Sequence, residues 1–414
     1  MSRLLGIRIK NYKSFADLGL GQVEYGAGDP LPRFACFIGP NGSGKSTLLD
    51  AFGFVADCLL EGVEAACDKP HRGGFDRLRT QGAGAPISFE IFFDSEDGTQ
   101  PIVYALDVDL VEGVPKLTKE TLRQRRIGET RGKPYHFLKL DRGAGKVWAG
   151  NYLERHDDKE AEKIQLDDLN RLGLATLGNL ASHPRVVKLR TYIEQWYLSY
   201  FVPTAARAQP PAGAQPRLDR EGANVGNVLQ YFQRTHPKRF TAIVERVTKS
   251  IPGLRKIKTE VSTDKRLLLK FDESGYHDPF YQQNMSDGTL KMLAYAVLLA
   301  DPAPRPFIGI EEPENGLYVE LIEHLARQFV AYTAKRAALT QIFVTTHSPY
   351  FVDALMPEQV WIMQKADGRA TATRVEDLEI VRLLTKQGVP LGAQWYANHF
   401  ATSGPKTKSA RSSR

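Results

Sequence analysis

Cysteine is scarce in this chain, which has three among 414 residues. Cys36, Cys58 and Cys67 are too few for a disulfide framework, and their spacing is not that of a metal site. Long hydrophobic runs are also missing, because the longest (293–300) has eight residues and a membrane span needs about 20. The first residues lack the apolar stretch and cleavage site of a signal peptide. We therefore expect a soluble protein of the reducing cytoplasm, with no membrane partner.

Neither sign of charge dominates strongly. Lys and Arg number 55 and Asp and Glu number 48, which gives a formal net charge of +7. With 42% apolar and 25% charged residues, the composition is that of a globular chain and excludes collagen-like and wholly disordered proteins. The modest basic excess permits contact with nucleic acid but does not establish it, since interspersed charges are usually a solvated surface.

The pattern along the chain predicts an α/β protein with an inserted middle region. Residues 34–38 form a continuous apolar run that is typical of a buried strand, and 47–60 carry apolar residues at helical spacing. Residues 86–147 alternate in hydrophobicity between turn residues, which indicates an antiparallel β subdomain. Residues 151–200 have a charged, helical pattern. Strand–helix alternation resumes in the last third, with strands predicted at 307–310, 341–345 and 360–363 and a helix at 319–334, which implies a parallel sheet.

These changes of pattern divide the chain into four predicted segments. Residues 1–95 and 255–400 would form the two parts of one core. Residues 96–254 would form the inserted β and helical subdomain, with a Pro-rich linker near 203–220. Residues 401–414 are rich in Ser, Lys and Arg without an apolar anchor, so we expect a disordered basic tail.

A glycine-rich loop follows the first buried strand. Residues 39–46 match the Walker A pattern of Gly, four residues and Gly-Lys-Ser, and they lie between a strand and a helix, as phosphate binding requires. Backbone N–H groups and the helix N-terminus would face the phosphates, Lys45 would bridge the β- and γ-phosphates, and Ser46 would bind Mg²⁺. The residues expected at the nucleotide are Gly39, Pro40, Asn41, Gly42, Ser43, Gly44, Lys45, Ser46 and Thr47.

A pair of glutamates ends a second apolar run. Residues 306–310 lead into Glu311 and Glu312, and the carboxyl end of a parallel strand lies at the ligand-binding edge of the sheet. Glu311 would hold Mg²⁺, and Glu312 would polarise the attacking water. Acidic pairs are also common in turns, so the assignment to a Walker B element depends on the accompanying phosphate loop.

Two further elements have both a structural and a functional interpretation. His347 follows the strand 341–345 and could hydrogen-bond a γ-phosphate, although a lone histidine is more often structural. Ser286 and Gly288 precede an apolar helix, where Ser286 would be an N-cap and the helix start could also bind an anion.

Taken together, these four motifs resemble the ABC-type ATPases, a class that includes RecF, the SMC proteins and the overcoming-lysogenization-defect nucleases. The opening residues 7–15 are similar to the first strand of these proteins, and the chain looks most like their compact bacterial predicted AAA-family ATPases, many of which occur in anti-phage or toxin–antitoxin-like gene pairs. The resemblance covers about 1–95 and 255–365.

The resemblance implies roles for several residues and a dimer. Ser286 and Gly288 would form the signature motif, which contacts the γ-phosphate bound to the other protomer, so that a homodimer sandwiches two ATP molecules. Asn315 would lie in the D-loop, His347 would be the switch histidine, and Gln81 is the best candidate for a Q-loop residue at the metal. The implied cofactors are ATP and Mg²⁺.

Biologically, the resemblance favours an ATP-hydrolysing switch in anti-phage defence that acts on nucleic acid or on an effector protein from a neighbouring gene. The alternatives are a RecF-like DNA repair ATPase and a nucleotide-gated scaffold with negligible turnover. Two basic clusters could contact phosphate backbones, or they could be solvated faces. They comprise Arg123, Arg125, Arg126, Arg131, Lys133 and Lys139, and Lys249, Arg255, Lys256 and Lys258.

Overall fold

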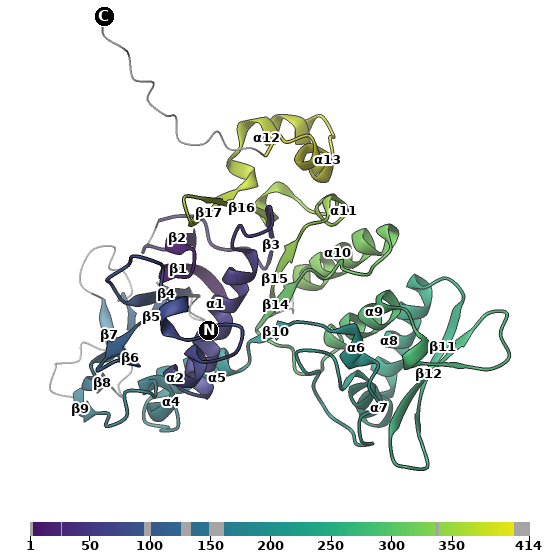
Figure 1. Ribbon diagram of the computed structural model, residues 1–414, viewed down its shortest axis with the longest axis horizontal. Coiled ribbons are helices and arrows are strands. Elements are labelled where there is room, and N and C mark those ends of the chain that lie inside the picture. The colour runs from purple at the N-terminus through teal and green to yellow at the C-terminus, as the bar shows by residue number, and fades with distance from the viewer. Residues whose placement is uncertain are drawn as a thin grey trace, which may run out of the picture.

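The structure is a computed structural model that describes residues 3–25, 27–94, 101–125, 134–148, 161–335 and 339–400 (Figure 1). A central sheet of six strands has the order β10, β14, β15, β3, β16, β17. Neighbours from β10 to β16 pair in parallel, and β17 returns antiparallel to β16. In that order the strands span Tyr197–Ser199, Phe307–Glu311, Gln341–Thr346, Phe34–Ile38, Val360–Ala366 and Arg369–Arg374. The predicted parallel α/β sheet is confirmed.

Two helices connect the strands that carry the predicted motifs. α1 (Lys45–Leu60) follows β3, and α10 (Val319–Ala334) lies between β14 and β15 in the chain, both where helical spacing predicts them. The other α-helices are α2 (Val63–Cys67), α3 (Phe75–Leu78), α4 (Gly173–Leu177), α5 (Pro184–Glu194), α6 (Pro203–Ala206), α7 (Val225–Thr235), α8 (Pro237–Ser250), α9 (Asp287–Leu298), α11 (Pro349–Val352), α12 (Glu379–Lys386) and α13 (Leu391–Tyr396).

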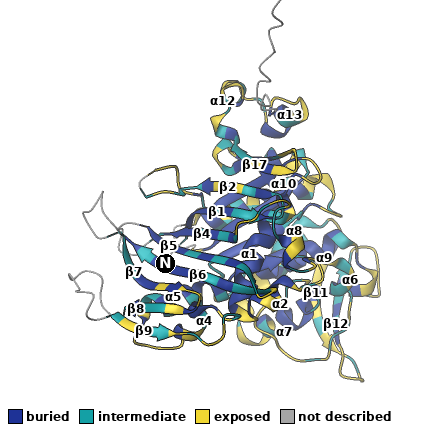
Figure 2. Cartoon of the chain, turned by 60° about the vertical axis from the view of Figure 1, so that its left-hand side comes forward, coloured by how far each residue is buried: buried dark blue, intermediate teal, exposed yellow. Residues whose placement is uncertain are grey.

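The central sheet separates two hydrophobic cores. Ala35 and Phe37 of β3 pack with α1 and with strands of a second sheet, whereas Phe34, Cys36 and Ile38 pack with α9 and α10 on the opposite face. All five side chains are buried, and so is most of α1 (Figure 2). Burial on both faces explains why β3 is a continuous apolar run.

The second sheet is antiparallel and has the strand order β2, β1, β4, β5, β6, β7, β8, β9. It confirms the antiparallel subdomain predicted from alternation. It also takes in β1, β2 and β4, so it joins the predicted first segment to the inserted one. Its strands span Leu4–Tyr12 (β1), Phe15–Gly21 (β2), Ile87–Phe93 (β4), Ile102–Val111 (β5), Val114–Gln124 (β6), Tyr135–Asp141 (β7), Ala144–Trp148 (β8) and Ala161–Gln165 (β9).

The helical prediction for 151–200 is wrong in two places. Residues 161–165 form β9, an edge strand of the antiparallel sheet, and 197–199 form β10, an edge strand of the central sheet. Pairing of β9 with β8 and of β10 with β14 overrides the local helical pattern in the two segments. α4 and α5 lie between them, so the prediction holds for these helices, and residues 151–160 lie outside the described residues.

A third, three-stranded sheet packs near α7 and α8, at the right of Figure 1. It consists of β11 (Leu254–Val261), β12 (Leu267–Glu273) and β13 (Phe280–Tyr281). α12 and α13 follow β17 and lie at the top of Figure 1. No helix among the described residues is long and apolar enough to cross a membrane. The tail predicted at 401–414 lies outside the described residues.

Candidate functional site

The predicted phosphate loop lies between the end of β3 and the start of α1. Two of its glycines are required by close packing. A Cβ on Gly39 would lie 2.2 Å from the carbonyl oxygen of Met363, and one on Gly44 would lie 3.0 Å from the Phe15 ring. Their φ angles are 150° and 105°, which side chains disfavour. The loop therefore fits tightly between β16 and β2.

Lys45, the first residue of α1, is buried at the centre of the loop. Its Nζ donates to the carbonyl oxygens of Gly39 at 2.9 Å and Pro40 at 3.1 Å. Burial lowers the pKa of this ammonium, and three nearby carboxylates oppose part of the shift. They belong to Glu312, Glu311 and Glu314. A cation, a loop of N–H donors and an acidic edge thus meet at the ends of the parallel strands.

Glu312 is held at both carboxylate oxygens. Its Oε1 lies 3.1 Å from Nε2 of His347, and its Oε2 accepts from Nδ2 of Asn315 at 2.7 Å. Its amide donates to the carbonyl oxygen of Thr345 at 3.0 Å. The residue has a φ of 42°, a left-handed conformation that costs a non-glycine residue about 1–3 kcal/mol. The chain therefore keeps this carboxylate in one orientation at the cost of local strain.

Glu314 is a site residue that the sequence analysis missed. Its side chain is buried, and its Oε1 accepts from Oγ1 of Thr346 at 2.6 Å and from the amide of His347 at 2.7 Å. Its Oε2 has no hydrogen-bond partner among the described residues. Glu314 thereby fixes the backbone that carries His347. Its position two residues after Glu312, in a turn leaving a buried strand, was the available signal.

A cavity of about 840 Å³ lies beside the loop. It is lined by the loop, the strand ends, the β1–β2 turn, the segment 77–81 and the β16–β17 turn. Its lining comprises Lys13, Ser14, Asn41, Gly42, Gly44, Lys45, Ser46, Thr47, Arg77, Arg79, Thr80, Gln81, Glu312, His347, Lys365, Asp367, Gly368 and Arg369. It brings together nine predicted site residues from four separate parts of the sequence.

Six predicted residues do not line this cavity: Gly39, Pro40, Ser43, Glu311, Ser286 and Gly288. Gly39, Pro40 and Ser43 belong to the loop itself; Gly39 and the Ser43 side chain are buried, and Pro40 is exposed. Glu311 ends β14 beside Thr345 of β15. The last two residues belong to a separate element.

Ser286 and Gly288 lie at the start of α9. Ser286 is the N-cap, and its Oγ accepts from the amide of Thr289 at 3.2 Å. Ser286 is exposed, whereas a Cβ on Gly288 would lie 3.0 Å from the carbonyl oxygen of Gly316. The capping interpretation is therefore confirmed.

Lys291 connects α9 to the turn that follows β14. Its buried Nζ donates to the carbonyl oxygen of Asn315 at 2.7 Å and to that of Glu312 at 3.3 Å. Burial lowers the pKa of this ammonium, and Glu314, Asp287 and Glu312 oppose the shift. The N-terminal part of α9 and the strained turn thus form one connected unit.

The oxygen donors near the loop suit a magnesium ion. The hydroxyl of Ser46 lines the cavity, and the carboxylate of Glu311 lies near enough to act on the pKa of Lys45. Mg²⁺ prefers such ligands together with phosphate oxygens and water. Gln81 also lines the cavity and is exposed. Among the described residues, no group of three His, Cys, Asp or Glu side chains could hold a metal ion.

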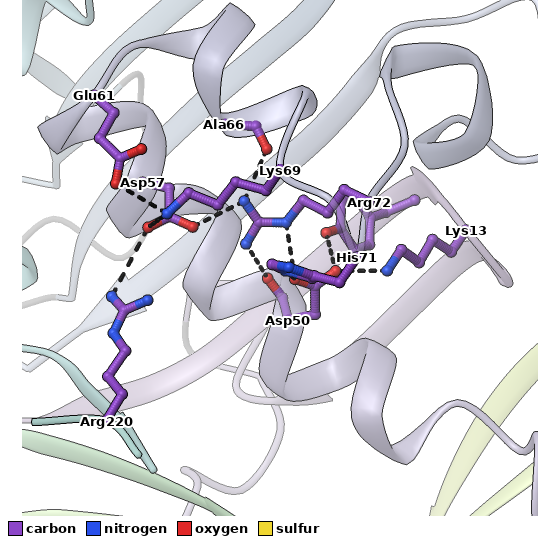
Figure 3. A network of polar contacts seen from close by, with 10 residues as sticks. Lys13, Asp50, Asp57, Glu61, Ala66, Lys69, His71, Arg72 and Arg220 are labelled. Carbon is purple, nitrogen blue, oxygen red and sulfur yellow. Dashed lines mark hydrogen bonds and ion pairs between the residues drawn. The ribbon is translucent and has the colours of Figure 1, made fainter. Parts of the chain in front are cut away.

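A buried ionic network braces α1 behind the loop (Figure 3). Arg72 donates to Oδ1 of Asp50 and to Oδ2 of Asp57, each at 2.8 Å, and thereby bridges two carboxylates of α1. Lys13 lies 2.7 Å from Asp50, and Lys69 lies 2.8 Å from Asp57. The network joins α1 to the β1–β2 turn and to the segment before α3, both of which continue into the cavity wall.

The basic clusters are only partly described. Arg126, Arg131 and Lys133 lie outside the described residues, and Arg123 pairs with Glu90. In the second cluster Lys249, Arg255, Lys256 and Lys258 are exposed. Of these, Lys258 lies 3.1 Å from Asp272. Partial pairing agrees with the solvated-face interpretation and leaves nucleic-acid contact a prediction.

Comparisons with known proteins place this site in a known fold. A family model described as "AAA domain, putative AbiEii toxin, Type IV TA system" matches residues 34–353. The structural maintenance of chromosomes protein 1 of Saccharomyces cerevisiae is 44% identical over 55 residues. This match covers 13% of the chain and only 4% of that relative's length.

Two solved structures are similar over nearly their whole length. The SMC head bound to the C-winged helix domain of ScpA has a TM-score of 0.56 at 16% identity and covers 91% of this chain and 99% of its own. The second is the Smc head domain with an extended coiled coil bound to the C-terminal domain of ScpA, from Pyrococcus furiosus. It also has a TM-score of 0.56, at 13% identity, and the match covers 94% of this chain and 100% of that chain. The fold is therefore that of an ABC-type P-loop ATPase head.

Proposed function

The chain belongs to the family of AAA domains described as putative AbiEii toxin, Type IV TA system, and from this premise we propose that it is a switch that binds ATP with Mg²⁺ and hydrolyses it. One observation carries the proposal. The Glu312 carboxylate lines the same cavity as Lys45 and is held on both oxygens by His347 and Asn315. An oriented carboxylate facing a phosphate loop is suited to orient and deprotonate an attacking water.

Each side chain then has a defined task. The triphosphate would take the place of the loop carbonyls as the partner of Lys45, because a phosphate oxygen is the stronger acceptor. Ser46 and Glu311 would hold Mg²⁺, which when bound neutralises charge on the phosphates. Glu312 would accept a proton from the water that attacks the γ-phosphorus. The bond from that phosphorus to the bridging oxygen breaks, and ADP and phosphate leave. His347 would donate a hydrogen bond to the γ-phosphate.

We further propose that two copies of the chain close over two ATP molecules. Ser286 is exposed and does not line the cavity beside the phosphate loop of the same chain. A phosphate that Ser286 contacts would therefore be one bound to the loop of a second copy. As the N-cap of a helix of twelve residues, it lies where N–H donors and the helix dipole favour an anion. The connection through Lys291 would pass closure at α9 to the strained Glu312 turn.

The biological proposal is anti-phage defence with a partner effector or nucleic acid. It is supported by the family's description as a toxin of a toxin–antitoxin system. The two similar SMC heads are bound to ScpA domains, and heads of this fold can therefore carry a protein partner. A RecF-like repair role and a scaffold without turnover are the alternatives.

The decisive test compares steady-state ATP turnover of the wild type, Glu312→Gln and the control Glu245→Gln, which alters an exposed glutamate of α8. We expect Glu312→Gln to lose about 10²–10⁴-fold in turnover, to keep ATP affinity, and to form an ATP-dependent dimer by light scattering. Unchanged turnover in this variant would refute the catalytic assignment. A wild type that binds ATP without measurable turnover would favour the scaffold.

A further inference from the structure

The order of the central strands determines where the nucleoside must lie. Glu312 and His347 follow β14 and β15, which are on one side of β3, and β16 is on the other side. The γ-phosphate has to lie beside Glu312, because this carboxylate is the one that would act on the attacking water. The triphosphate therefore crosses the end of β3, and the nucleoside extends toward β16 and β17.

The β16–β17 turn stands at that place. Ile362 is the last residue of β16 that pairs with β3, opposite Ile38, and the strand continues to Ala366. These four further residues carry the turn about 13 Å past the end of β3, at ~3.3 Å per residue. Its tip is formed by Asp367 and Gly368, with φ angles of 50° and 76°, which is the pattern of a tight two-residue hairpin turn.

The base of this hairpin is fixed to the phosphate loop. Met363 provides the carbonyl oxygen against which Gly39 packs, and a Cβ on Gly44 would lie 3.2 Å from that of Ala370. The amide of Ala370 donates to the carbonyl oxygen of Ser14 at 2.8 Å. The turn is thus held at a set distance from the bound phosphates, as a group that reads the rest of the nucleotide requires.

The chemistry of the cavity wall is polar at this end. Among the described residues that line the cavity there is no Phe, Tyr or Trp on which a base could stack. Besides Glu312, the lining contains one carboxylate, that of Asp367, with Lys365 and Arg369 on either side. A carboxylate near phosphate sites lowers anion affinity, but it can accept a hydrogen bond from a donor on the ligand, such as the ribose hydroxyls that Asp and Glu bind in other nucleotide sites.

We propose that the β16–β17 turn is the nucleoside-recognition element, and that the Asp367 carboxylate accepts a hydrogen bond from an O–H or N–H donor of the nucleoside whose phosphates lie on Gly39–Ser46. This inference rests on the proposed function, because it takes ATP as the ligand of the loop. It assigns specificity to a residue outside the four motifs.

The test uses Asp367→Asn in the full chain. Asn-Gly is a favoured sequence for this turn, so the substitution keeps the hairpin and removes only the charge. Affinities for ATP and for inorganic tripolyphosphate are measured by calorimetry with Mg²⁺. We expect ATP to bind about tenfold more weakly, which corresponds to about 1.4 kcal/mol, with tripolyphosphate binding unchanged or tighter. The control, Asp264→Asn, alters an exposed aspartate of the β11–β12 turn and should change neither.

Two wild-type measurements identify the donor. Weaker binding of 2′-deoxy-ATP indicates a ribose hydroxyl, and weaker binding of inosine triphosphate, which lacks the exocyclic amine, indicates the base. In the Asp367→Asn variant, the preference for ATP over the more weakly bound analogue should disappear.

The outcomes separate this inference from the proposed function. Equal changes for ATP and tripolyphosphate, or no change for ATP, would overturn the role of Asp367 while the P-loop site stands. A wild type that binds neither ligand would overturn both.

Discussion

Replacing Arg72 by Met tests the structure behind the phosphate loop. The Arg72 side chain is 1% exposed and donates to Asp50, Asp57 and the carbonyl oxygen of Ala66 at 2.8, 2.8 and 2.9 Å. Methionine fills part of the same space but provides no charge and no donor. The substitution therefore leaves two carboxylates of α1, both nearly inaccessible to solvent, without their shared partner.

The expected loss of unfolding free energy depends on the cations that remain beside each carboxylate. Removing one member of a buried ion pair costs about 3–5 kcal/mol. Asp50 retains Lys13 at 2.7 Å, and Asp57 retains Lys69 at 2.8 Å, so neither charge becomes fully unpaired. We expect the lower end of that range, about 3 kcal/mol of unfolding free energy.

The loss should also depend on pH. Burial pushes the pKa of Asp50 upward, but Arg72 and Lys13 outweigh it and hold the pKa below its usual value. The stabilisation from Asp50 is thus present above the unfolded pKa of about 3.9 and disappears as the pH falls through the lowered folded pKa. Without Arg72, burial raises the pKa of Asp50 in the folded variant. Asp50 of the variant then takes up a proton between pH 7 and pH 4, which removes the buried charge and its cost in unfolding free energy. The difference between the two proteins should therefore shrink over that range.

Urea unfolding of the wild type and of Arg72→Met, at pH 7 and near pH 4, measures this difference in unfolding free energy. The control is Arg327→Met, because Arg327 pairs with Glu323 on the surface and is 69% exposed; it should cost less than about 1 kcal/mol. A loss for Arg72→Met as small as that of the control, or the same loss at both pH values, would show that the network does not stabilise α1.

Three further predictions concern the loop and its ligands. Lys45→Ala should abolish ATP binding in calorimetry, since the cation that faces the phosphates is removed; unchanged affinity would contradict the loop assignment. Gly39→Ala should destabilise the protein by several kcal/mol in urea unfolding, because its Cβ would lie 2.2 Å from the carbonyl oxygen of Met363. Gly42→Ala, which meets no atom within 4 Å, should cost about 1 kcal/mol, and equal losses would argue against this packing. Removal of Mg²⁺ with EDTA should stop turnover and readdition should restore it; turnover that persists would exclude Ser46 as a required ligand.

The sequence alone was sufficient for features that depend on local backbone and spacing. A strand, a glycine-rich turn and a helix are consecutive, so 34–60 could be read directly and agree with β3 and α1. The strands that end at Glu311 and before His347 are apolar on both faces, and parallel strands place their carboxyl ends at one edge. Their meeting with the loop could therefore be predicted without knowing the strand order. The helical prediction for 161–165 is wrong because pairing with β8 determines the strand conformation of that segment.

Tertiary structure decided which groups surround Glu312. Asn315 and His347 hold Glu312 across 3 and 35 positions of the chain, and Lys291 reaches the same turn from α9. The β16–β17 turn becomes part of the cavity because β16 lies next to β3 on the side away from β15. Such contacts depend on strand order and on the direction of each side chain, and no local pattern encodes either. The motif residues, with Asn315 and His347 among them, could be found from spacing, whereas their contacts with Glu312 and the residues that face the nucleoside could be found only from the fold.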